Sequence, residues 1–97
     1  MGKCVARIKL SDQDFVAIKT LALQDGVKLY EILDKALLTT SMNMPLSAIR
    51  PHGQHTYKTL YHTSPDNVLH IAEQLDCNQS NAIYTAIHHL LNEERVA

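Results

Sequence analysis

The sequence predicts a mainly helical chain that carries one short two-stranded antiparallel ribbon. A pattern of one strand followed by two helices occurs twice, once in residues 1–40 and again in residues 56–97. Each copy opens with residues that alternate in polarity and continues with apolar residues at helical spacing. The chain of 97 residues has the size of one domain. We therefore expect the two copies, joined by a linker over 41–55, to form one compact domain.

The first strand is expected over residues 3–10. Alternation with period two and one apolar face is typical of a half-buried strand. One set of side chains should point into the core and the other outward. The inward set is Cys4, Ala6, Ile8 and Leu10, and the outward set is Lys3, Val5, Arg7 and Lys9.

Two helices should follow this strand. Ser11 is placed to cap the first one, and Gly26 supplies the left-handed residue that ends it. The second helix is expected from about residue 29. Its apolar stripe consists of Ile32, Leu33, Ala36 and Leu37.

The second copy repeats this order with different residues. Tyr57, Thr59 and Tyr61 alternate with Lys58, Leu60 and His62, and we expect the two tyrosines to face inward. Ser64 and Pro65 predict the start of a helix, and Asn78 is placed to cap the next one. Ala22 and Ala72 lie 50 positions apart, whereas Ser11 and Ser64 lie 53 apart. The first helix of the second copy should therefore be about one turn shorter.

The linker over 41–55 holds Pro45, Pro51 and Gly53. Such residues interrupt regular structure. A short helical turn is expected at Leu46, Ala48 and Ile49. We expect this linker to act as a tether with little function of its own.

The charge of the chain is distributed unevenly. Its net charge of −1 does not by itself favour nucleic acid. However, Lys3, Arg7 and Lys9 lie within seven residues, and no acidic residue precedes Asp12. No apolar run approaches the roughly 20 residues that span a bilayer, and the N-terminus does not resemble a signal peptide. We expect a cytoplasmic protein without a membrane partner.

Nothing in the sequence predicts catalysis, a metal site or a cofactor. His52 and His55 have i, i+3 spacing, but no complete zinc-binding pattern includes them. Cys4 and Cys77 fall on expected apolar faces, so we expect buried thiols and not a disulfide or a nucleophile. A glycine-rich phosphate loop and a pair of catalytic carboxylates are also missing from the sequence. We therefore assign no catalytic residue.

Both copies share the order of strand, helix, turn and helix, and the same residue types recur at matching positions. The residues that carry this pattern are Val5–Ser11, Leu21-Ala22, Gly26-Val27, Glu31–Leu33 and Ala36-Leu37 in the first copy, and Ala72–Leu75, Cys77–Ser80, Ala82-Ile83 and Ala86-Ile87 in the second. This pattern resembles the ribbon-helix-helix family of DNA-binding proteins, the MetJ/Arc type, in a tandem single-chain form. The resemblance implies a pseudo-dimer whose two strands pair as a ribbon that enters the DNA major groove.

The resemblance also implies roles for individual residues. Backbone N–H groups that open the second helix of each copy would hold DNA phosphates. Outward strand residues would read base edges, and Arg7 is the best placed for a bidentate contact with guanine. The implied base-reading residues are Lys3, Val5, Arg7, Lys9, Lys58, Leu60 and His62, and the implied phosphate sites are Lys28, Leu29, Asn78 and Gln79.

We therefore expect sequence-specific binding of double-stranded DNA by a transcriptional regulator or repressor associated with the bacterial nucleoid. Two alternatives stay open. One is an accessory DNA-binding role in the relaxosome of a conjugative plasmid, where tandem arrangements of this kind are known. The other is a protein-interaction module that has lost DNA binding. Self-association on DNA, an unidentified protein partner, and pairing of repeats within one chain or between two chains also stay open.

Overall fold

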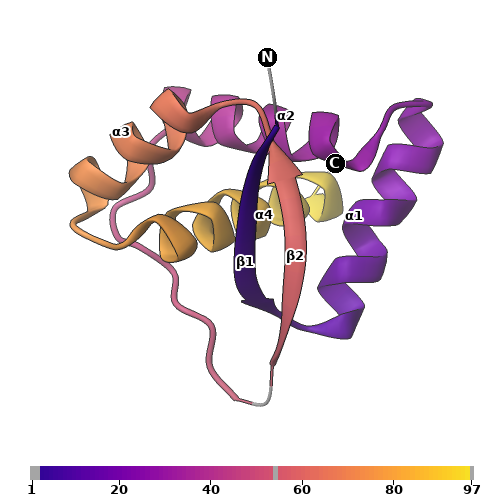
Figure 1. The fold of residues 1–97 in the computed structure, drawn as a ribbon, viewed down its shortest axis with the longest axis horizontal. Coiled ribbons are helices and arrows are strands. Elements are labelled where there is room, and N and C mark those ends of the chain that lie inside the picture. Colours follow the sequence, from indigo (N-terminus) through magenta and orange to yellow (C-terminus); the bar gives the residue numbers. More distant parts are fainter. Residues whose placement is uncertain (1–2, 54, 97) are drawn as a thin grey trace.

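The computed structural model describes residues 3–53 and 55–96 (Figure 1). Over these residues the chain forms two strands and four helices, with the order strand, helix, helix occurring twice. This confirms the mainly helical class with a single antiparallel ribbon. The elements are β1 (Cys4–Leu10), α1 (Asp12–Asp25), α2 (Leu29–Met42), β2 (Thr56–His62), α3 (Pro65–Leu75) and α4 (Gln79–Val96).

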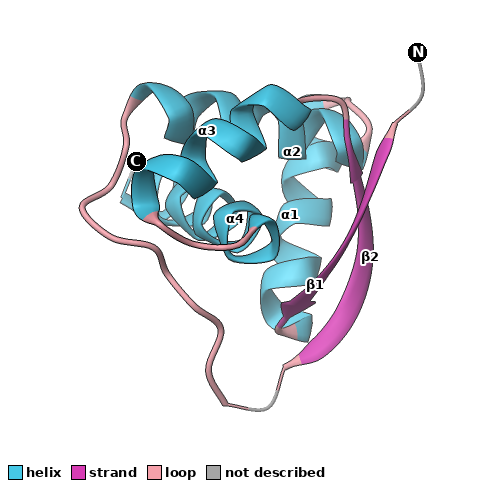
Figure 2. Ribbon diagram, turned by 60° about the vertical axis from the view of Figure 1, so that its left-hand side comes forward, coloured by secondary structure: helices cyan, strands magenta, loops and turns pink. Residues whose placement is uncertain are grey.

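The two strands pair with each other inside one chain. They run antiparallel, with Arg7 opposite Thr59 at the centre of the ribbon. The ribbon lies along one side of the helices, and none of the helices in the described ranges covers its other face (Figure 2). The fold therefore leaves one complete face of the ribbon available to solvent.

The hydrophobic core lies between the inner face of the ribbon and the helices. β1 contributes Ile8 and Leu10 to it, β2 contributes Leu60, and each of the four helices contributes further apolar side chains. Burial of one such side chain stabilises the fold by about 1.5–3 kcal/mol. The largest fully buried aliphatic side chains are Ile8, Leu10, Ile18, Ile32, Leu33, Leu37, Leu60, Val68, Ile71 and Ile87.

The helix ends follow the signals in the sequence. The Ser11 hydroxyl accepts a hydrogen bond from the Asp14 N–H at 3.1 Å, which satisfies a backbone donor at the start of α1. Gly26 ends α1 with a φ of 67°, a conformation that favours glycine. Asn78 caps α4 by accepting from the Asn81 N–H at 2.8 Å. Helix α3 has 11 residues and α1 has 14, as the offset between the copies predicts.

The start of α3 is held differently from the start of α1. Ser64 occupies the cap position, but its hydroxyl does not cap the helix. It donates instead to the Asp34 carboxylate of α2 at 3.0 Å. The same carboxylate accepts from the Thr63 N–H at 2.7 Å and from the Thr63 hydroxyl. A residue from the first repeat therefore fixes the turn between β2 and α3.

The segment that connects the two repeats differs from the prediction. Helix α2 continues to Met42, so the connecting segment comprises residues 43–55, and residues 46–49 form no helical turn. The backbone of Ile49 bonds instead to the Thr85 hydroxyl of α4, with its N–H donating at 2.9 Å and its carbonyl accepting at 3.2 Å. The Ile49 side chain packs against the core. The segment is therefore docked on α4, and the predicted short helical turn within it is wrong.

Candidate nucleic-acid interface

The second strand faces the opposite way from the prediction. Leu60 and His62 are only 1% and 5% exposed, whereas Tyr57 and Tyr61 are 55% and 48% exposed. Residues directly opposite each other in an antiparallel pair share a face. Leu60 lies opposite the inward Ala6, so it points into the core. The prediction that Leu60 and His62 read bases is therefore wrong.

Lys58 is also removed from the outer face. It lies opposite the buried Ile8, and its ammonium group donates to the Asp12 carboxylate and to the Thr56 hydroxyl, each at 2.6 Å. The hydrogen bond and charge of Lys58 hold the pKa of Asp12 below its ordinary value of 3.8. The ion pair joins β2 to the first turn of α1, which gives Lys58 a structural contact in place of the predicted base contact.

His62 takes part in the turn that follows β2. Its Nδ1 accepts a hydrogen bond from the Ser64 N–H at 3.2 Å, which requires that nitrogen to be unprotonated. Burial lowers the pKa of His62, and the nearby Asp34 carboxylate opposes this effect. His62 is therefore a structural residue that bonds to the turn at the end of the ribbon.

The outer face of the ribbon combines cations from one strand with tyrosines from the other. In β1 the predicted outward residues are exposed, although their base-reading role stays a prediction. In β2 the prediction missed the outward residues, which Leu60 could have revealed as the only aliphatic residue of that strand. The face consists of Lys3, Val5, Arg7 and Lys9 with Tyr57, Thr59 and Tyr61.

Aromatic rings hold the cations of this face close to the ribbon. The Arg7 guanidinium lies 5.1 Å from the centre of the Tyr57 ring, and the Lys9 ammonium lies 5.5 Å from it. Lys3 lies 4.4 Å from the centre of the Tyr30 ring in the first turn of α2. Such cation–π contacts contribute about 0.5–1 kcal/mol each at exposed sites. The three cations are therefore positioned before any ligand arrives.

The two predicted phosphate sites lie at the helix starts, as expected. Lys28 precedes α2 and is exposed, and the Lys3 contact places this helix start beside one end of the ribbon. Asn78 and Gln79 open α4. The first N–H groups of a helix have no partner within it and lie at its positive end. Both starts can thus accept an anion, and their contact with phosphate stays a prediction.

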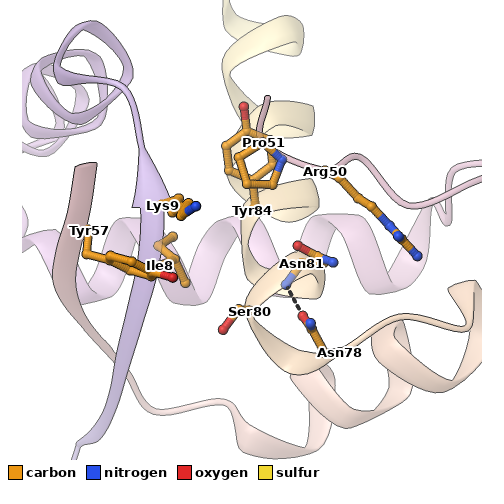
Figure 3. Close-up of a pocket in the computed structure, with 9 residues that line it drawn as sticks. All are labelled: Ile8, Lys9, Arg50, Pro51, Tyr57, Asn78, Ser80, Asn81 and Tyr84. Carbon is orange, nitrogen blue, oxygen red and sulfur yellow. Dashed lines mark hydrogen bonds between the residues drawn. The ribbon is translucent and has the colours of Figure 1, made fainter. Parts of the chain in front are cut away.

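A hollow of about 350 Å³ joins the start of α4 to the ribbon (Figure 3). Lys9 and Tyr57 line it from the ribbon, and Arg50 and Pro51 line it from the connecting segment. Ser80 and its neighbours in the first turns of α4 complete the wall. The hollow thus has one cation on its ribbon side, Lys9, and one on the side of the connecting segment, Arg50.

The remaining reactive side chains form no second cluster in the described part of the chain. Across residues 3–53 and 55–96, no group of three histidine, cysteine or acidic residues is placed to hold a metal ion. Cys4 and Cys77 are free, half-buried thiols, and burial raises the pKa of Cys77. None of the helices within the described ranges is long and apolar enough to cross a bilayer.

No protein-family model, curated protein or solved structure matches this chain.

Proposed function

We propose that this chain is a sequence-specific regulator that binds double-stranded DNA as a tandem ribbon-helix-helix protein, with its ribbon in the major groove. The outer face of the ribbon carries this proposal. It is exposed, it presents Lys3, Arg7 and Lys9 together, and neither strand contains an acidic residue. A two-stranded ribbon fits the major groove, which is about 12 Å wide. An acid-free cationic ribbon on a chain of net charge −1 is suited to the negative surface of DNA.

The spacing of the outward residues suits base pairs. Outward neighbours along a strand are two residues apart, which is about 6.7 Å. Base pairs stack about 3.4 Å apart, so consecutive outward pairs match about two base-pair steps. The three cross-strand pairs, centred on Arg7 and Thr59, therefore span about five base pairs.

The two strands offer different chemistry to those base pairs. Arg7 has the planar fork that pairs with the two acceptors of guanine, a contact with about 1–3 kcal/mol of discrimination. Thr59 and the rings of Tyr57 and Tyr61 offer apolar surface of the kind that contacts the methyl group of thymine. We therefore expect a binding site without twofold symmetry, with guanine facing β1 and thymine facing β2.

Selection from a random duplex library tests this proposal. Wild type should enrich one non-palindromic sequence, and Arg7→Ala should lose most of the preference at one guanine, by about tenfold or more. The control is Lys19→Ala, which removes an exposed cation from α1 instead of the ribbon. It should enrich the same sequence as wild type. A wild-type chain that binds no duplex at low salt contradicts the proposal.

One observation favours the second candidate, a protein-interaction module. Helix α1 exposes Val16 and Leu23, at 59% and 83%. These residues are seven positions apart, so they lie on one side of the helix. Pull-down of a protein partner by wild type but not by Leu23→Ser, together with no duplex binding, would favour this candidate over DNA binding.

A further inference from the structure

We propose that Arg50, in the segment that connects the two repeats, contacts the DNA backbone beside α4 and supplies a cation that the second repeat lacks at its own helix start. This inference rests on the proposed DNA-binding function. It assigns a binding role to the connecting segment, for which the sequence predicts only a tether.

The two helix starts differ in charge. Lys28 precedes α2, and the residue 50 positions later, Asn78, precedes α4. The Asn78 side chain is neutral, and its oxygen already accepts from the Asn81 N–H. Asp76, two residues earlier, adds a negative charge to this turn. The start of α4 therefore needs a cation from elsewhere to attract phosphate as strongly as the start of α2.

The fold brings Arg50 to this place through a buried anchor. Thr85 is 0% exposed, and its hydroxyl bonds to both backbone groups of Ile49, at 2.9 and 3.2 Å. Pro51 restricts the backbone on the other side of Arg50. The backbone of Arg50 is thus held against α4, while its side chain is exposed and extends away from Lys9 and Tyr57, on the far side of Asn81 (Figure 3).

The hollow beside the ribbon has a cation on each side, Lys9 on the ribbon and Arg50 on the connecting segment (Figure 3). Among the described residues that line it, Lys9 and Arg50 carry charge, and no carboxylate is present. The positive charge of Arg50 also reaches Cys77, where it opposes the rise in thiol pKa that burial causes. Arg50 thus lies beside the turn before α4. When the ribbon occupies the major groove, a backbone phosphate that flanks the groove is the anion nearest to this hollow.

The test compares wild type and Arg50→Ala on the fluorescent duplex selected by wild type, over a series of salt concentrations. Loss of one phosphate contact should reduce the slope of log Kd against log salt by about 0.9. Affinity near 0.1 M salt should fall by about threefold to tenfold, with the preferred sequence unchanged. Arg50→Lys should restore the slope, because a phosphate needs only a positive charge. Lys19→Ala, which removes one charge outside the interface, should keep the wild-type slope.

Ethylation interference locates the contact. Arg50→Ala should lose interference at phosphates on one flank of the site and keep it on the other. If Arg50→Ala keeps the wild-type slope, this inference is overturned and the proposed function is left intact. Loss of interference on both flanks has the same consequence. Wild type that binds no duplex overturns both. Thermal unfolding of Arg50→Ala should match wild type, since the Ile49 anchor uses backbone atoms.

Discussion

The two strands of the ribbon are equal in length and pair residue for residue, yet they resemble each other on one face only. Toward the core, each ends in two nearly inaccessible side chains, Ile8 and Leu10 in β1 and Leu60 and His62 in β2. Toward solvent, β1 is cationic and β2 is aromatic. Packing thus constrains the inner faces to similar shapes, while the outer faces can differ without disturbing the fold. This difference agrees with the proposed recognition of a non-palindromic DNA sequence.

The largest expected effect on stability comes from a substitution on the inner face of β2. Leu60→Ala should lower the free energy of unfolding by about 2–5 kcal/mol, because it removes a fully buried side chain and leaves a cavity. Thr59→Ala, on the adjacent but exposed position, should change it by less than about 0.5 kcal/mol. Urea denaturation followed by circular dichroism measures both. A larger effect for Thr59→Ala than for Leu60→Ala would mean that β2 faces the other way.

The sequence was informative where local patterns decide the structure. In β1 the aliphatic Ile8 and Leu10 alternate with cations, so one orientation is clearly favoured. In β2 the two tyrosines alternate with Leu60, so only one set can point inward, and the prediction places the tyrosines there. A tyrosine can remain half exposed because its hydroxyl is polar, whereas Leu60 has no polar atom in its side chain to favour exposure. The single leucine was therefore the better signal.

Contacts between segments that lie far apart in the sequence cannot be recognised from a local residue pattern. Asp34 holds a turn 29 and 30 residues away, and Thr85 holds Ile49 across 36 residues. Neither residue belongs to a motif that marks its partner. The helix starts of the candidate site could be predicted from Gly26 and Asn78, because caps and turns are local. The orientation of Arg50 could not, because it depends on the docking of the connecting segment.

The second prediction compares the two turns that lead from strand to helix. The β1–α1 turn relies on the Ser11 cap within its own repeat, and the β2–α3 turn relies on Asp34 from the other repeat. Ser11→Ala should lower the free energy of unfolding by about 1 kcal/mol. Asp34→Ala should lower it by about 1–3 kcal/mol, because one carboxylate serves three hydrogen bonds. A smaller effect for Asp34→Ala than for Ser11→Ala would contradict this difference.

The smallest expected effect is a change in the free energy of unfolding with pH. It compares the last inward residue of each strand, which is Leu10 in β1 and the titratable His62 in β2. Burial lowers the pKa of His62 below its ordinary value of 6.5. Above pH 6.5 the imidazole is neutral in both the folded and the unfolded chain, so its contribution to stability is complete. As the pH falls through 6.5, the unfolded chain binds a proton that the folded chain does not. The free energy of unfolding should therefore decrease until the pH reaches the lowered pKa.

Urea denaturation of wild type and His62→Asn between about pH 8 and 5.5 separates this effect from carboxylate titration, which lies mostly lower. Wild type should lose stability over this range, and His62→Asn should lose less. The asparagine Oδ1 stands at the position of the imidazole Nδ1 and can still accept the Ser64 N–H, so the turn keeps its hydrogen bond while the titrating group is removed. Parallel curves for the two proteins would place the pKa of His62 at its ordinary value and would show that the inner face of β2 admits the charged imidazole.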